Sequence, residues 1–119
     1  LILGSRVAGR APRAVLEAMG RHCDVVSVNP YRPDGASPAA YLGQIAALTR
    51  RPVLLTEFSW RAQENRSGLA NTKGAESTVP TQADRAERYR RFVAGALASP
   101  VVLGAHWFQY FDQPPAGRW

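Results

Sequence analysis

The sequence predicts an α/β protein built on a parallel sheet, and two observations carry this prediction. Short apolar runs alternate with amphipathic stretches in the order strand, helix, strand, helix, strand, helix, strand. That alternation is typical of right-handed crossovers between parallel strands. Polar and aromatic residues also collect at the carboxyl ends of the expected strands, where a β/α barrel keeps its active site. The 119 residues, 45% of them apolar, suffice for one hydrophobic core.

The first four elements follow from their apolar patterns. Residues 1–7 begin with the apolar run LIL and predict a strand, and residues 12–23 predict a helix because their apolar residues recur at helical spacing. The run DVVSVN at residues 24–29 predicts the second strand. Residues 38–50 again show helical spacing and predict the second helix.

The last three elements show the same alternation. Residues 52–58 predict a third strand and residues 101–107 a fourth. Between them, residues 82–98 have the clearest helical periodicity in the chain. Thr81 and Asp84 have the spacing of a capping box, which marks the start of this helix.

Residues 59–80 show no periodicity and predict a long loop. A loop of this length in a compact domain is usually either functional or disordered. We favour an ordered substrate loop, because it leaves directly from the strand that ends near Glu57. Asn71 and Lys73 are its candidate sugar-binding side chains.

Glu57 is the first candidate for a catalytic group. It follows the apolar run PVLLT and precedes Phe58, Ser59 and Trp60, so a single carboxylate lies among apolar and aromatic side chains. Burial disfavours the charged form of a carboxyl group unless the group is paired or has a function. The alternative that Glu57 is a strand-end glutamate paired with an arginine stays open.

Strand alternation groups the candidate residues by face. Each of three alternating series predicts side chains that point to the interior of a barrel. The series are Val25, Ser27, Asn29 and Tyr31; Val53, Leu55 and Glu57; and Leu103, Ala105, Trp107 and Gln109. On the same alternation His106 points away from Trp107, which is typical of a packing histidine.

Five segments together resemble a known family. They are DVVSVNPY at 24–31, PVLLTEFSW at 52–60, SGLANTKGA at 67–75, VPTQADRAERYRRFV at 79–93 and GAHWFQYFDQPPAGR at 104–118. In order and spacing they resemble the C-terminal half of agarase-like glycoside hydrolases in the large retaining clan, clan A, of TIM-barrel enzymes. The resemblance covers nearly the whole chain. It implies that residues 1–119 are part of one catalytic domain and form strands five to eight of a (β/α)8 barrel.

The resemblance also implies roles for individual residues. Glu57 matches the catalytic nucleophile at the end of the seventh strand, and Trp107 matches an aromatic platform for the sugar. Tyr31 matches a tyrosine that donates a hydrogen bond to the nucleophile. Asn29 and Gln109, with Asn71, Lys73 and the aromatic Trp60, complete the expected substrate-binding residues.

Retaining hydrolysis needs two carboxyl groups roughly 5 Å apart, one as nucleophile and one as acid and base. A neighbouring hydroxyl or cationic donor would keep the nucleophile ionised by lowering its pKa, and Tyr31, Arg6 or His106 is expected to supply it. The family carries its acid/base glutamate on the fourth strand, before the position of Leu1. We therefore expect residues 1–119 to be a fragment with negligible activity alone, from an enzyme acting on β-linked galactan of the agar type.

Composition argues against several other functions. The net charge of +6 arises partly from an arginine-rich helix that also carries acidic residues, which indicates a solvated face rather than a nucleic-acid site. No apolar run is long enough for a membrane span. One cysteine excludes an internal disulfide and a cysteine-based zinc site. No metal or organic cofactor is implied, and the resemblance favours a periplasmic or secreted location.

Two alternatives remain from the sequence. The first is a non-catalytic carbohydrate-binding or interaction module that presents Trp60, Trp107 and Trp119 to a glycan. The second is a flavodoxin-like domain that binds a phosphate compound. The second is disfavoured because the turn at residues 4–9 lacks the glycine spacing of a phosphate-binding loop. The sugar, the linkage and endo or exo action are not fixed by these residues.

Overall fold

A computed structural model describes residues 2–5, 11–66, 68 and 77–111. The elements, in chain order, are β1 (Ile2–Ser5), α1 (Arg13–His22), β2 (Val25–Val28), α2 (Ala39–Thr49), β3 (Val53–Phe58), β4 (Trp60–Ala62), β5 (Ser77–Val79), α3 (Gln82–Leu97) and β6 (Val102–Trp107). All seven expected elements are present, most of them shorter by a residue or two at an end. No described helix is long and apolar enough to cross a membrane.

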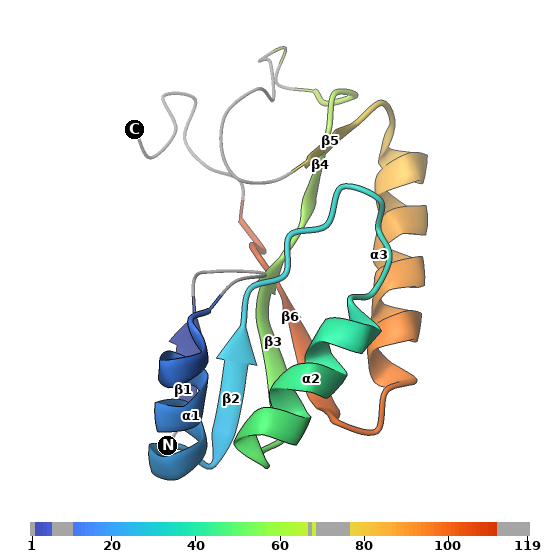
Figure 1. The fold of residues 1–119 in the computed structure, drawn as a ribbon. Coiled ribbons are helices and arrows are strands. Elements are labelled where there is room, and N and C mark those ends of the chain that lie inside the picture. The colour runs from blue at the N-terminus through green and yellow to red at the C-terminus, as the bar shows by residue number, and fades with distance from the viewer. Residues whose placement is uncertain (1, 6–10, 67, 69–76, 112–119) are drawn as a thin grey trace.

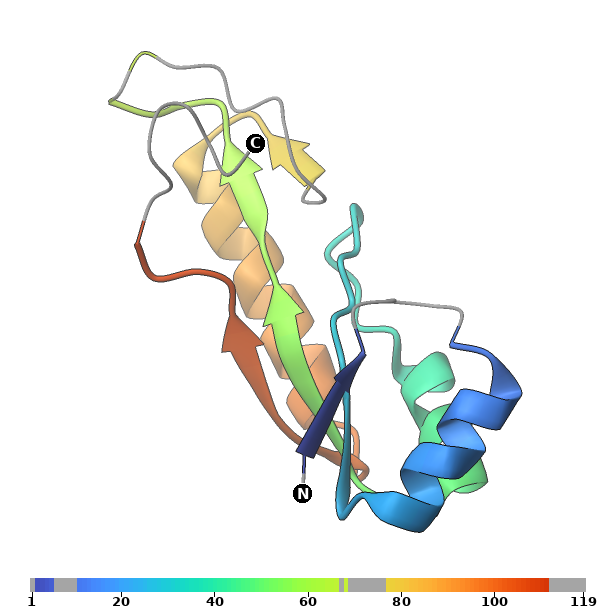
Figure 2. The same ribbon diagram turned by 90° about the vertical axis from the view of Figure 1, so that its left-hand side faces the viewer.

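The main sheet is parallel and its strands are neighbours in the order in which the chain reaches them, β1, β2, β3 and β6. Because successive crossovers have the same hand and move in the same direction, they place their helices on the same side of the sheet. Figures 1 and 2 show α1, α2 and α3 following one side of the curved sheet. Among the described elements, none covers the opposite face.

The hydrophobic core lies between the sheet and the three helices. Its members are all 7% exposed or less, and burial of one such large side chain stabilises the fold by about 1.5–3 kcal/mol. They include Leu16 and Met19 of α1, Leu42 and Ile45 of α2, Phe92 and Ala96 of α3, and Val26, Val28, Val53, Leu55 and Phe58 of the sheet.

The prediction that Thr81 and Asp84 cap the third helix is confirmed. The Thr81 hydroxyl accepts from the Asp84 backbone N–H at 3.0 Å, and the Asp84 carboxylate accepts from the Thr81 backbone N–H at 3.1 Å. These two bonds satisfy backbone donors that a helix leaves without partners at its start. The helix therefore begins at Gln82, next to the end of β5.

The prediction of a loop without secondary structure over residues 59–80 was wrong at both of its ends. Strands β4 and β5 pair in parallel, with Trp60 opposite Ser77 and Ala62 opposite Val79. Three-residue strands are too short to give a periodic signal in the sequence.

Strict alternation also failed near the carboxyl ends of β3 and β6. Val53, Leu55 and Phe58 are at most 1% exposed and belong to the core, whereas Glu57 is only partly buried. The register between β3 and β6 shifts between Leu55 and Phe58, and such an irregularity inserts residues that break the period of two. Glu57 therefore does not share the face of Val53 and Leu55.

A second register shift affects β6. Val53 pairs with Val102, but Leu54 pairs with Gly104, so Leu103 is skipped and is 60% exposed. Ala105 and Trp107 pack against the core instead of facing away from the helices. The expectation that Leu103, Ala105 and Trp107 form one interior series is thereby corrected.

Candidate active site

The site begins with a hydrogen bond between the two most informative residues of the sequence. The Tyr31 hydroxyl donates to Glu57 Oε2 at 2.8 Å, and both side chains are partly buried. Glu57 lies near the end of β3, and Tyr31 follows the end of the neighbouring strand β2. Since the carboxyl ends of parallel strands meet at one edge of the sheet, residues 26 positions apart in the chain come together.

A second contact lies between the same two strands. The Thr56 hydroxyl donates to Asn29 Oδ1 at 2.6 Å, and Asn29 is 5% exposed. This bond joins the end of β2 to β3, two residues before Tyr31 on one segment and one residue before Glu57 on the other. Asn29 has an evident structural role, and its predicted contact with a sugar stays a prediction.

Trp60 requires a correction. It is 0% exposed, and its indole N–H donates to the Arg32 carbonyl oxygen at 2.7 Å. Its ring meets Phe58 and Phe92 edge-on, with centroids 6.0 and 5.6 Å away. A side chain without accessible surface cannot stack on a sugar, so the structure does not support Trp60 as a substrate-binding residue. The same burial removes one of the three tryptophans on which the binding-module alternative relied.

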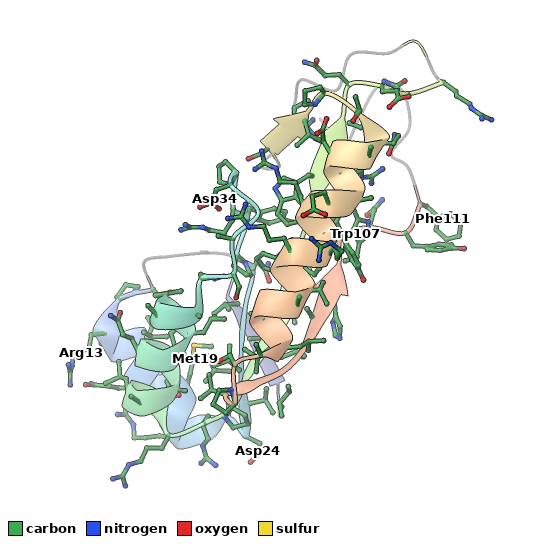
Figure 3. The ribbon with its side chains drawn as sticks, turned by 90° about the vertical axis from the view of Figure 1, so that its right-hand side faces the viewer. Arg13, Met19, Asp24, Asp34, Trp107 and Phe111 are labelled. Carbon is green, nitrogen blue, oxygen red and sulfur yellow. The ribbon has the colours of Figure 1, made fainter. Side chains whose placement is uncertain are left out.

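Trp107 lies beside α3, as Figure 3 shows. Its ring meets Phe58 edge-on at 5.6 Å and Tyr89 at 5.5 Å, and the Arg85 guanidinium carbon lies 5.0 Å from its centroid. Trp107 also lines a hollow of about 480 Å³ with Gln82, Arg85, Ala86 and Tyr89. These contacts place the ring on the helix side of the sheet, whereas the sequence predicted that it points to a barrel interior. Its role as a sugar platform is not tested by these contacts and stays a prediction.

The remaining candidates are less informative. Gln109 is partly buried, and its side-chain amide donates to the Phe111 carbonyl oxygen at 2.9 Å. His106 is exposed. Asn71, Lys73 and Arg6 lie outside the described residues. Within the described part of the chain, no three His, Cys, Asp or Glu side chains form a group suited to a metal ion.

The loop that carries Tyr31 has several contacts that sequence reasoning did not find. Residues 29–38 connect β2 to α2, and this loop is bonded both to Trp60 and to Arg88 of α3. Within the loop, the Ala36 backbone N–H and the Arg32 guanidinium hold the pKa of Asp34 below its ordinary value. The only sequence signal for this arrangement is the turn-forming run RPDG at residues 32–35.

The chain was compared with protein families, curated proteins and solved structures. No protein-family model matches the chain. Beta-agarase A of Vibrio sp. (strain JT0107) is 38% identical over 123 aligned residues, which include 99% of this chain. The chain is similar to a segment of beta-agarases. It spans only 12% of the length of that relative.

Two solved structures agree with this similarity. An exo-beta-agarase structure matches 98% of the chain with a TM-score of 0.79 and 32% identity, and the match covers 15% of that protein. A crystal structure of another agarase matches 98% of the chain with a TM-score of 0.76 and 32% identity, over 16% of its length. The expected resemblance to agarase-like glycoside hydrolases is therefore supported by both sequence and fold.

Proposed function

We propose that these 119 residues form part of the active site of an agar-degrading glycoside hydrolase, with Glu57 as the nucleophile. The observation that carries the proposal is the 2.8 Å hydrogen bond from Tyr31 to Glu57 at the carboxyl edge of the sheet. Similarity to agarases over almost the full chain supports the substrate class. The protein as a whole would then cleave β-linked galactan of the agar type.

We further propose that the domain is the C-terminal half of a (β/α)8 barrel. Three crossovers produce four sequentially ordered parallel strands with their helices on one side. Successive strand–helix units of such a barrel have this same arrangement. An open doubly wound sheet instead reverses its strand order and places helices on both faces. The face of the sheet without described helices would then become the barrel interior.

The proposed chemistry is a double displacement. A Glu57 carboxylate oxygen attacks the anomeric carbon and forms a glycosyl ester while the glycosidic bond breaks. A second carboxylic acid protonates the leaving oxygen, then takes a proton from the water that hydrolyses the ester. We place this second group on the part of the barrel that precedes Leu1. Tyr31 contributes by donating a hydrogen bond to Glu57 Oε2, which holds the carboxylate in one orientation.

The test uses the complete open reading frame that contains these residues. Glu57→Gln should reduce turnover of agaro-oligosaccharides at least about a thousandfold, because amide nitrogen and oxygen cannot replace the attacking carboxylate. The matched control is Glu17→Gln on α1, whose side chain pairs with Arg13 at 2.7 Å. The control should retain activity within about twofold, as expected for a surface pair.

Two further measurements address the mechanism. A 2-deoxy-2-fluoro galactoside with a good leaving group should label the peptide that contains Glu57, as detected by mass spectrometry. Proton NMR should show that the first product keeps the β anomeric configuration. Full activity of Glu57→Gln would refute the nucleophile assignment, and an initial α product would refute retention. Glycan binding without turnover by the complete protein would favour the binding-module alternative.

A further inference from the structure

The loop that presents Tyr31 to Glu57 is held by two side chains from elsewhere in the fold. The Trp60 indole N–H donates to the carbonyl oxygen of Arg32 at 2.7 Å, directly after Tyr31 in the chain. The Arg88 guanidinium on α3 donates to the carbonyl oxygen of the next residue, Pro33. Two consecutive backbone carbonyls are therefore bonded by two different elements.

The contact with Trp60 closes a small ring that includes the proposed nucleophile. Glu57 and Trp60 are three residues apart on one chain segment, and Tyr31 and Arg32 are adjacent on the other. The two segments are joined by the Tyr31 to Glu57 bond and by the Trp60 to Arg32 bond. Because Trp60 is fully buried and its ring packs against Phe58, the indole can move little. The position of its N–H is thereby fixed relative to Glu57.

The contact with Arg88 depends on the shape of the loop. Gly35 has φ +69°, and a Cβ atom built on it would lie 2.7 Å from Arg88 Cδ. The glycine thus permits the loop to approach α3 closely enough for the guanidinium to reach Pro33. Figure 3 shows Asp34, which lies between Pro33 and Gly35 in the sequence, on the loop beside α3.

We infer that Trp60 and Arg88 are positioning residues that act through Tyr31 and place its hydroxyl against Glu57. This inference rests on the proposed function, and neither side chain is assigned contact with the substrate. It replaces the predicted substrate-binding role of Trp60 with an indirect one. The two carbonyl contacts fix the backbone next to Tyr31. A fixed backbone restricts the orientation of the Tyr31 side chain and so keeps its hydroxyl within hydrogen-bond distance of Glu57.

The experiment is a double-mutant cycle in the complete protein, with agaro-oligosaccharide hydrolysis as the assay. Trp60→Phe removes the N–H but keeps an aromatic ring in the core, and it should lower kcat about threefold to tenfold with little change in KM. Tyr31→Phe should lower kcat by a similar or larger factor. If Trp60 acts through Tyr31, Trp60→Phe in the Tyr31→Phe background should lower kcat less than about twofold.

Arg88 is tested in the same way with a matched control. Arg88→Met should lower kcat about threefold to tenfold in the parent and less than about twofold in the Tyr31→Phe background. Arg91→Met, an exposed arginine on the same helix, should leave kcat within about twofold in both backgrounds.

Melting temperatures measured on every variant separate loss of fold from loss of positioning. The positioning inference is refuted if Trp60→Phe and Arg88→Met lower kcat by the same factor with and without Tyr31, or leave kcat unchanged in the parent. The proposed function fails in a different way, by full activity of Glu57→Gln. The two failures are therefore distinguishable.

Discussion

Replacement of Gly35 by alanine tests the geometry of the Tyr31 loop directly. Gly35 is buried, has φ +69°, and leaves 2.7 Å between a new Cβ and Arg88 Cδ. The left-handed conformation costs a non-glycine residue roughly 1–2 kcal/mol. Relief of the overlap requires the Arg88 side chain to move away from Pro33, and loss of that hydrogen bond costs about 1 kcal/mol more. We expect Gly35→Ala to lower the free energy of unfolding by about 2–3 kcal/mol.

Gly43→Ala is the matched control because it makes the same chemical change in a permissive place. Gly43 lies within α2, and nothing stands within 4 Å of a Cβ built on it. Alanine is favoured over glycine in a helix by about 0.8–1.0 kcal/mol, so this variant should be more stable than the parent.

Urea unfolding followed by tryptophan fluorescence should measure both changes, with Trp60 as a buried reporter. The two variants should shift the unfolding midpoint in opposite directions at an unchanged slope with urea concentration. A Gly35→Ala protein within about 0.5 kcal/mol of the parent would refute the close contact between the loop and α3. Shifts of both variants in the same direction would refute the reasoning from local backbone geometry.

Two other predictions concern the start of α3 and the loop that carries Tyr31. Thr81→Ala should lower the free energy of unfolding by about 1 kcal/mol and Thr81→Ser should restore most of it, because serine keeps the hydroxyl that accepts from the Asp84 backbone N–H. Asp34→Asn should lower the melting temperature slightly near pH 7. The pKa of Asp34 is depressed below its ordinary value of 3.8 in the folded state. The stabilisation that the charged carboxylate gives to the fold is therefore fully present above that value. The difference from the parent should therefore close as the pH falls through the lower folded-state pKa, and a gap that persists in acid would contradict the charge-based explanation.

The proximity of Tyr31 and Glu57 was predictable from sequence because it depends on topology. Parallel strands joined by right-handed crossovers bring their carboxyl ends to one edge, whatever the details of packing. The order of strands and helices is enough to place residues 31 and 57 at that edge. The capping box at Thr81 was equally predictable, since both partners lie within one turn.

The orientation of Trp107 could not be obtained in this way. Alternation assumes an unbroken strand, and a single skipped residue such as Leu103 moves every later side chain to the other face. Such shifts arise from how two strands pair, which is not encoded in either strand alone. The same limit applies to Trp60, whose burial depends on Phe92 from a helix 32 residues away in the chain.

The short β4–β5 ladder has a consequence for how proteins of this type can diversify. It fixes both ends of residues 63–76, with Gln63 and Glu64 bonded to the carbonyl oxygens of Val79 and Pro80 at 2.9 and 3.0 Å. The entropic cost of closing a loop rises by only about 0.6 kcal/mol for each doubling of its length. Insertions or deletions between these anchors would therefore be inherited without displacing Glu57 on one side or α3 on the other. On the proposed function, substrate range could then evolve in this segment while Glu57 and Tyr31 keep their positions.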